Sequence, residues 1–212
     1  MRTRTIATVA MKGGAGKTTT VVHLAVAAML TGEKVAILDT DPQGSASAWA
    51  RTREAEEPLV IKVEPRQVAD AVTAAEEEGY SLILIDTAPR AEPNAAATCR
   101  ASDFVLVPVR PSAFDLDTVE QTVAILKATG KLDASAFILN ACPSRAPEVL
   151  EARSFCESLA VPLAPVELGL RRVYARAVQT GYSVQEFEPR GAAAQETADL
   201  WTYVHKHMQR RP

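Results

Sequence analysis

The sequence has few of the residues that build a disulfide framework or a metal cluster. It contains three cysteines in 212 residues, which are widely separated and form no CxxC pair: Cys99, Cys142 and Cys156. We therefore expect reduced, partly buried thiols, and neither disulfides nor an iron–sulfur centre.

Long apolar runs are also absent. The run at 23–30 falls well short of the ~20 residues that cross a bilayer. The first residues contain two arginines and a short apolar run, but a lysine and glycines follow before a signal-peptide core develops. These features predict a cytoplasmic protein.

The chain has no excess of positive charge. It carries 23 Lys and Arg against 26 Asp and Glu, a formal net charge of -3. This balance argues against a surface covered in basic residues, although a local basic patch remains possible. With 47% hydrophobic residues, the composition is that of a globular protein. The length is most simply accommodated as one domain over residues 1–212.

Short apolar runs rich in β-branched residues alternate with amphipathic stretches along the chain. This alternation predicts a mostly parallel, twisted sheet covered by helices on both faces, a three-layer α/β/α fold with its site at the carboxyl ends of the strands. The charged run 53–58 is expected to be a solvated loop. The expected strands are 5–10, 34–41, 59–63, 82–86, 104–109, 136–141 and 161–166, and the expected helices are 17–31, 66–78, 94–101, 115–129, 147–159, 170–179 and 192–209.

Residues 10–20, AMKGGAGKTTT, nearly match the phosphate-loop pattern of Gly, four residues and Gly-Lys-Ser/Thr. Gly16, Lys17 and Thr18 fill the second half, but Met11 stands at the first glycine position and an additional lysine, Lys12, follows it. The segment comes after a predicted strand and opens a predicted helix, the context in which backbone N–H groups and a helix N-terminus bind phosphate.

Each residue of this loop has an expected role. Lys17 is expected to reach the β and γ phosphates, Thr18 to offer its hydroxyl to Mg²⁺, and Thr19 to help hold the α-phosphate. The predicted nucleotide site is completed by the successive backbone N–H groups of Gly13, Gly14, Ala15 and Gly16.

Carboxylates follow two of the predicted strands. Asp86 ends the strand 82–86, where it can hold a water of the Mg²⁺ shell, although a strand-end turn is the alternative. Asp39 and Asp41 end the second strand, and their i, i+2 spacing predicts that both point to the same side. One of them could orient the attacking water.

Together these segments resemble the ParA/MinD family of P-loop ATPases with a deviant Walker A motif. The resemblance includes the loop 12–19, LDTDPQGS at 38–45 and LILIDTAP at 82–89, and extends through 107–120 and 171–186. Within the family, the chain is most similar to short, ParF-like plasmid-partition ParA proteins.

The resemblance implies an ATPase that forms a homodimer around two ATP molecules with Mg²⁺. Lys12 would reach the phosphates in the partner subunit and act in catalysis with Lys17, and Asp41 would be required for hydrolysis. Thr18, Asp41 and Asp86 would form the Mg²⁺ site. The family binds nonspecific DNA on the nucleoid, and a ParB- or ParG-like centromere-binding partner stimulates hydrolysis to segregate DNA.

The DNA and adenine contacts rest mainly on the resemblance. Asn140 and the backbone of Pro165 and Val166 occupy positions used around the base, although Asn140 could equally make a strand-end hydrogen bond. Glutamates are interspersed among the candidate DNA-binding residues, which are Arg145, Arg153, Arg171, Arg172 and Arg176.

Three other functions fit the same loop. A ParA-like protein can position a protein cargo such as carboxysomes, and a dethiobiotin-synthetase-like ligase shares the fold. A MinD-like regulator would bind membrane through a C-terminal amphipathic helix. Here Leu200, Tyr203, Val204 and Met208 form a helical stripe that we expect to pack on the sheet, so we expect no membrane partner.

Overall fold

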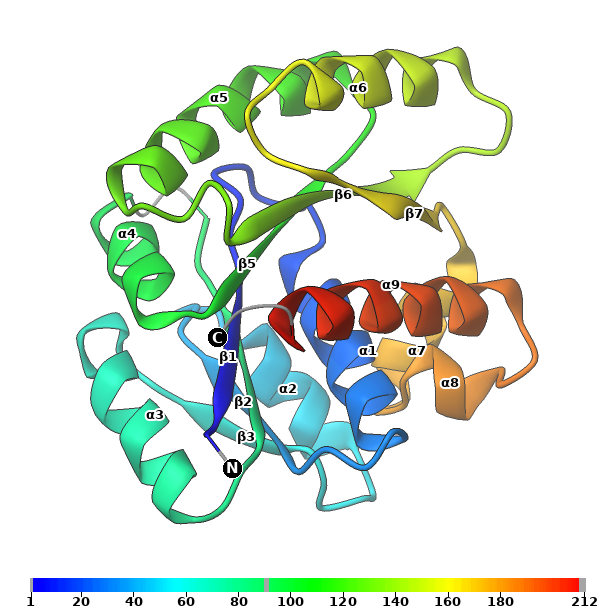
Figure 1. The fold of residues 1–212 in the computed structure, drawn as a ribbon. Helices are drawn as coiled ribbons and strands as arrows, with labels where there is room; N and C mark the ends of the chain where they lie inside the picture. Colours follow the sequence, from blue (N-terminus) through cyan, green and yellow to red (C-terminus); the bar gives the residue numbers. More distant parts are fainter. Residues whose placement is uncertain (1, 90–91, 210–212) are drawn as a thin grey trace.

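The structure, a computed structural model, describes residues 2–89 and 92–209 (Figure 1). Its strands form a seven-stranded, all-parallel sheet in the order β3-β2-β4-β1-β5-β6-β7. The strand order changes direction beside β1, so the carboxyl end of β1 lies at a topological switch point, where ligands bind in such sheets. The strands are β1 (Arg4–Thr8), β2 (Val35–Asp39), β3 (Leu59–Lys62), β4 (Leu82–Asp86), β5 (Phe104–Val109), β6 (Ser135–Cys142) and β7 (Leu163–Gly169).

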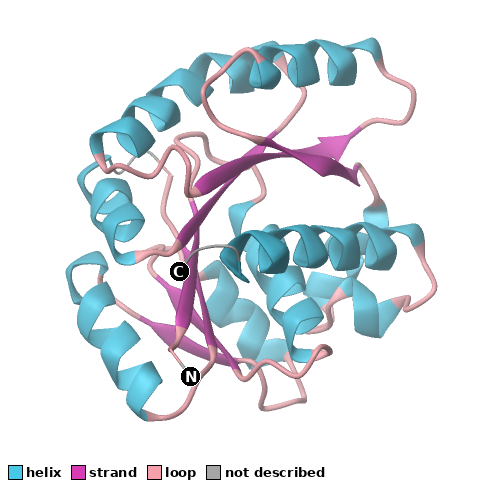
Figure 2. Cartoon of the chain, viewed as in Figure 1, coloured by secondary structure: helices cyan, strands magenta, loops and turns pink. Residues whose placement is uncertain are grey.

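Helices cover both faces of this sheet (Figures 1 and 2). One face packs against α1 (Lys17–Met29), α2 (Ser45–Thr52), α7 (Arg172–Gln179), α8 (Val184–Phe187) and α9 (Ala192–Gln209). The opposite face packs against α3 (Val68–Glu77), α4 (Glu92–Ala101), α5 (Ala113–Ala128) and α6 (Pro147–Glu157).

Strand β4 shows why the short apolar runs form buried strands. Its Leu82 and Leu84 lie in the first core, whereas Ile83 and Ile85 lie in the second, and all four are 0% exposed. A continuous apolar run is what a parallel strand buried on both faces requires. The predicted three-layer α/β/α fold is therefore confirmed.

Two short helices, α2 and α8, were not predicted, and several strands differ from their predicted bounds, β7 by the most. β7 was expected at 161–166 but begins at Leu163 and ends at Gly169. Its last residues continue to pair with β6, through Leu139 with Glu167 and Asn140 with Leu168, across a break in register. Pro165 is compatible with this strand because β7 is at the edge of the sheet.

The predicted loop 53–58 is a loop, but Arg53 is not solvated. Its side chain is 4% exposed, and its guanidinium forms two hydrogen bonds with the Glu186 carboxylate, at 2.6 and 2.8 Å. It also donates to the carbonyl of Gly181 at 3.0 Å. Trp49, on α2, donates to the carbonyl of Tyr182 at 3.1 Å. These bonds join the end of α2 to the connection between α7 and α8.

The C-terminal stripe packs on the body of the protein, as predicted. Leu200, Val204 and Met208 are buried in the first core, and Tyr203 packs against its edge. Among residues 2–89 and 92–209, no helix has both the length and the apolar character to cross a membrane. The three cysteines are buried and form no disulfide, and burial raises their thiol pKa values to about 11 or 12.

His23 is a fully buried histidine that makes stability depend on pH. It lies on α1, where its Nδ1 accepts a hydrogen bond from the backbone N–H of Val184 at 3.2 Å and its ring packs on Tyr174. Burial lowers its pKa from 6.5 to about 3. Between these values the unfolded chain binds a proton that the folded chain does not, so the free energy of unfolding falls as pH falls.

We expect His23→Asn, whose Oδ1 can replace Nδ1 as the acceptor, to reduce this pH dependence. Urea unfolding of both proteins at pH 7, 6, 5 and 4 measures it. The wild-type free energy of unfolding should fall more steeply than that of the variant, by up to about 1.4 kcal/mol per pH unit below pH 6. Parallel pH profiles would show that His23 titrates normally.

Candidate functional site

The glycine-rich loop connects the carboxyl end of β1 to the first turn of α1, as predicted. Gly14 and Gly16 have φ angles of 77° and 96°, in the left-handed region that favours glycine. Gly16 precedes α1, and its carbonyl accepts the N–H of Thr20 at 2.9 Å. Met11, at the position of the missing first glycine, is only 6% exposed, because its side chain packs inward. The loop therefore bends at Gly14 and Gly16 and does not need glycine at residue 11.

Lys17 is buried inside this loop. It is 6% exposed, and its Nζ donates to the carbonyls of Ala10 at 3.2 Å and Lys12 at 3.4 Å. Burial lowers its pKa, while the charges of Asp86 and Asp41 oppose the shift. The loop thus surrounds an ammonium group beside the N-terminus of a helix, an arrangement suited to phosphate.

Asp86 faces the same loop from the end of β4. Its Oδ2 accepts a hydrogen bond from the Thr18 hydroxyl at 2.6 Å, while its buried Oδ1 has no hydrogen-bond partner in the protein. Burial raises the pKa of Asp86 to about 7, and Asp39 and Asp41 add to the shift while Thr18 and Lys17 oppose it. A carboxylate with an unused oxygen beside a hydroxyl fits the oxygen ligands that Mg²⁺ prefers.

Asp39 and Asp41, which were expected to point to the same side, have different hydrogen-bond partners. β2 ends at Asp39, so the alternation of a strand does not extend to Asp41. Asp39 is fully buried, and its Oδ2 accepts from the N–H and hydroxyl of Ser47 at 2.8 and 2.7 Å. Asp41 is half-buried and accepts from the N–H of Gln43 at 2.9 Å. Asp39 therefore anchors the first turn of α2, and Asp41 is the candidate catalytic carboxylate of the pair.

The remaining loop residues lie around this centre. Gly13 and Gly14 are exposed, Ala15 is buried, and Lys12 and Thr19 are half-buried. The side chains predicted to hold phosphate and Mg²⁺ are thus brought to one edge of the sheet, at the ends of β1, β2 and β4.

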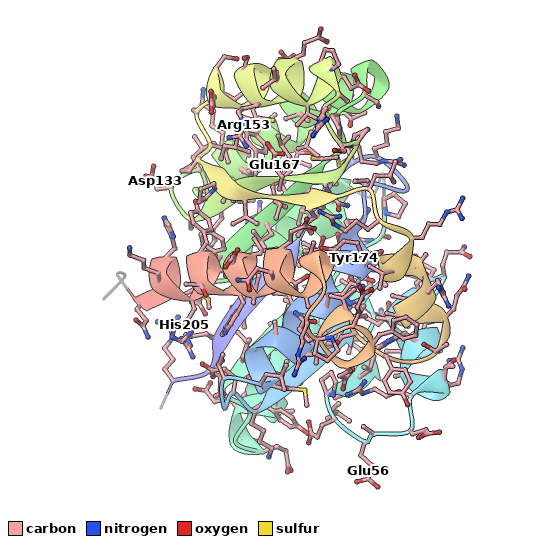
Figure 3. The ribbon with its side chains drawn as sticks, turned by 90° about the vertical axis from the view of Figure 1, so that its right-hand side faces the viewer. Glu56, Asp133, Arg153, Glu167, Tyr174 and His205 are labelled. Atoms are coloured by element: carbon pink, nitrogen blue, oxygen red, sulfur yellow. The ribbon has the colours of Figure 1, made fainter. Side chains whose placement is uncertain are left out.

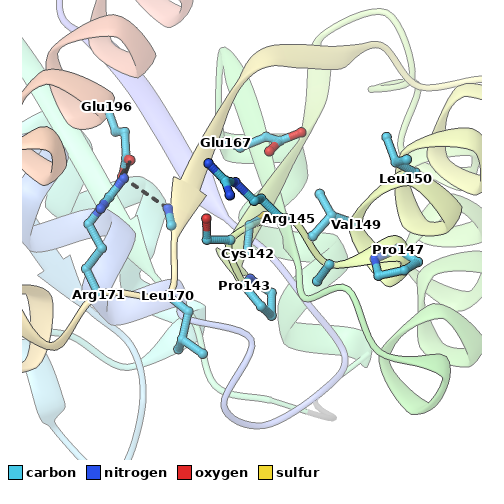
Figure 4. Close-up of a pocket in the computed structure, with 13 residues that line it drawn as sticks. Cys142, Pro143, Arg145, Pro147, Val149, Leu150, Glu167, Leu170, Arg171 and Glu196 are labelled. Carbon is cyan, nitrogen blue, oxygen red and sulfur yellow. Dashed lines mark hydrogen bonds and ion pairs between the residues drawn. The ribbon is translucent and has the colours of Figure 1, made fainter.

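A cavity of about 580 Å³ opens at the ends of β6 and β7 (Figure 4). Cys142 and Gly169 line it, and Asn140 lies two residues before Cys142. Pro165 and Val166, expected from the resemblance to lie near the base, are within β7, which continues to Gly169. The backbone at the carboxyl end of β7 is that of Gly169 and Leu170. These two residues were not predicted as part of the site because the strand was expected to end at residue 166.

The predicted DNA-binding arginines do not form one free basic surface. Arg153 pairs with Glu167 at 2.5 Å, beside it in Figure 3, and with Glu157 at 3.6 Å. Arg171 pairs with Glu196 at 2.5 Å and lines the cavity with Arg145, which is exposed.

The other two arginines are exposed on one helix. Arg172 and Arg176 lie four residues apart on α7, which places them on the same face. The Arg176 guanidinium lies 5.7 Å from the centre of the Phe187 ring.

The chain is similar to several known proteins. The family model for the CobQ/CobB/MinD/ParA nucleotide binding domain matches residues 6–184. Maintenance of carboxysome distribution protein A from Gloeobacter kilaueensis is 31% identical over 210 residues, which cover 98% of this chain and 94% of that protein. The chromosome-partitioning ATPase Soj from Thermus thermophilus is 32% identical over 155 residues, covering 59% of this chain and 62% of Soj.

Solved structures share the fold. The septum site-determining protein MinD from Pyrococcus horikoshii, complexed with Mg-ADP, matches with a TM-score of 0.79 at 22% identity, covering 97% of each chain. At this level of identity the match supports the fold alone.

The contrast between Asp39 and Asp41 can be measured without any ligand. We expect Asp39→Ala to lower the free energy of unfolding by about 1–2 kcal/mol, because the first turn of α2 loses a buried acceptor. Asp41→Ala, the matched control, should change it by less than about 0.5 kcal/mol. Urea unfolding at pH 7 measures both, and equal losses would mean that Asp41 is also a structural residue.

Proposed function

The chain belongs to the CobQ/CobB/MinD/ParA family of nucleotide-binding proteins, and from this we propose that it is a ParA-type ATPase that works as an ATP-bound dimer. The observation that carries the proposal is that two buried groups of opposite charge, one in the loop and one at the end of β4, are only partly satisfied by the protein. The Lys17 ammonium donates hydrogen bonds to the neutral carbonyls of Ala10 and Lys12, and the Asp86 carboxylate has a buried oxygen with no hydrogen-bond partner in the protein. A nucleotide with Mg²⁺ supplies an anion to the first and a cation to the second.

Different residues at the loop are assigned to the phosphates and to Mg²⁺. Lys17 exchanges the carbonyls of Ala10 and Lys12 for phosphate oxygens, and the backbone from Gly13 to Thr19 surrounds them. Thr18 and Asp86 are the groups that would hold Mg²⁺, and the ion, when bound, would neutralise charge on the phosphate oxygens.

Asp41 is the group proposed to orient the attacking water. It lies after β2, within electrostatic range of Lys17 and Asp86, and its side chain is only half-buried. Because Asp39 accepts two hydrogen bonds from Ser47, Asp41 is the carboxylate of the pair that remains available for hydrolysis and for the Mg²⁺ shell.

Lys12 supports a dimer. It is half-buried at the start of the loop, and its backbone carbonyl already accepts a bond from Lys17. In the ParA/MinD family that the loop resembles, the additional lysine reaches the phosphates of the partner subunit, so we assign Lys12 to the partner's nucleotide.

The cargo has two candidates. DNA segregation, with nonspecific DNA on the nucleoid and a ParB- or ParG-like partner, is supported by the similarity to Soj and by the exposed Arg172 and Arg176. Positioning of a protein cargo is supported by the carboxysome distribution protein, which matches nearly the whole chain. The stripe of α9 is buried in the core, which disfavours a membrane-binding role for it.

The dimer is tested with lysine variants. Lys17→Ala should abolish nucleotide binding, because the buried ammonium is lost. Lys12→Ala should bind ADP within about twofold of wild type but form no ATP dimer. Size-exclusion chromatography with light scattering measures dimers, with Asp41→Ala introduced to slow hydrolysis. Lys34→Ala, at the opposite edge of the sheet, is the control; ATP dimers that persist without Lys12 would refute its role.

DNA binding is tested with arginine variants. Replacing both Arg172 and Arg176 by Ala should weaken ATP-dependent binding to nonspecific duplex DNA and reduce the salt slope by about 2, one for each lost phosphate contact. Fluorescence anisotropy over a salt series measures both effects. The control is Arg153→Ala, whose guanidinium is already paired with two glutamates. Equal effects of both changes, or none, would exclude α7 as the DNA-binding helix.

A further inference from the structure

Asn140 connects strand β6 to the phosphate loop, although 125 residues separate it from the residue it contacts. Its side-chain Nδ2 donates to the carbonyl of Ala15 at 2.7 Å, and its Oδ1 accepts from the backbone N–H of Ala141 at 2.9 Å. The residue is 8% exposed. The amide is therefore held at both ends, one end on its own strand and the other on the loop.

The backbone on both sides of this amide has an unusual conformation. Ala141 has a φ of 54°, which is uncommon for a residue other than glycine and costs about 1–2 kcal/mol. Gly16 has a φ of 96°, and a Cβ built there would lie 1.9 Å from Asn140 Nδ2. The Asn140 amide thus fills the space that any side chain at residue 16 would need, so the two positions fit each other.

The bond to Ala15 also fixes the direction of the next N–H group. The carbonyl of Ala15 and the N–H of Gly16 belong to one planar trans peptide unit, in which the two groups point in opposite directions. Because Asn140 holds the carbonyl, the N–H of Gly16 must point away from Asn140. That N–H directly precedes Lys17 and the first turn of α1, where the phosphates are proposed to bind.

We propose that Asn140 is a positioning residue for phosphate binding. It turns the peptide between Ala15 and Gly16 so that the N–H of Gly16 faces the phosphates, and this effect is independent of the base attached to them. The inference rests on the proposed nucleotide binding and replaces the expected base contact with a role in forming the loop.

Two variants test this role. Asn140→Asp keeps the size and the acceptor for Ala141 but places an oxygen opposite the Ala15 carbonyl, and Asn140→Ala removes both bonds without adding charge. Affinities are measured by competition for Mg-ATP, Mg-GTP, Mg-CTP and inorganic tripolyphosphate, which has no base. We expect each variant to lose affinity by the same factor, about tenfold, for every ligand that wild type binds.

Other results would overturn the proposal. A loss confined to ATP, with tripolyphosphate and the other nucleotides unchanged, would make Asn140 a reader of the base. A loss in Asn140→Asp but not in Asn140→Ala would trace the effect to the added charge. Lower unfolding free energies with wild-type affinities would make the residue merely structural. If wild type binds none of the four ligands, the proposed nucleotide binding fails, and this inference fails with it.

Discussion

The burial of the Lys17 ammonium is the constraint on which the carboxyl edge of the sheet depends. A buried charge is costly unless other groups compensate it. Here the compensation is incomplete, since two backbone carbonyls accept from Nζ and burial still lowers the pKa of Lys17. The charge of Asp86 is also incompletely compensated, because one of its oxygens is buried without a hydrogen-bond partner and burial raises its pKa to about 7. A phosphate anion with a divalent cation would compensate both groups, which is why we propose that this edge of the sheet binds a nucleotide with Mg²⁺.

The same edge is connected mechanically to the rest of one face. Asp39 anchors α2, and α2 ends in Arg53, whose guanidinium pairs with Glu186 and bonds to Gly181. These contacts join the aspartate-containing segment to the connection between α7 and α8.

Most of the fold could be predicted because its signals are local. Buried strands such as β4 are apolar throughout, and the loop beside Lys17 lies between a strand and a helix. Short helices such as α2 carry a weak pattern, and its start depends on a tertiary bond from Asp39 to Ser47. The end of β7 was missed because pairing with β6, not its own sequence, continues the strand.

Among the candidate residues, the phosphate-loop side chains were brought together as expected, whereas the arginines were separated by partners that the sequence does not indicate, such as Glu196 for Arg171.

The account is tested most directly by calorimetric titration of ATP into the wild-type chain, with Mg²⁺ and with EDTA. It predicts one nucleotide bound per chain and binding weakened at least tenfold by EDTA, since Asp86 then has no cation to share with the phosphates. Absence of binding, or equal affinity with and without Mg²⁺, would contradict it.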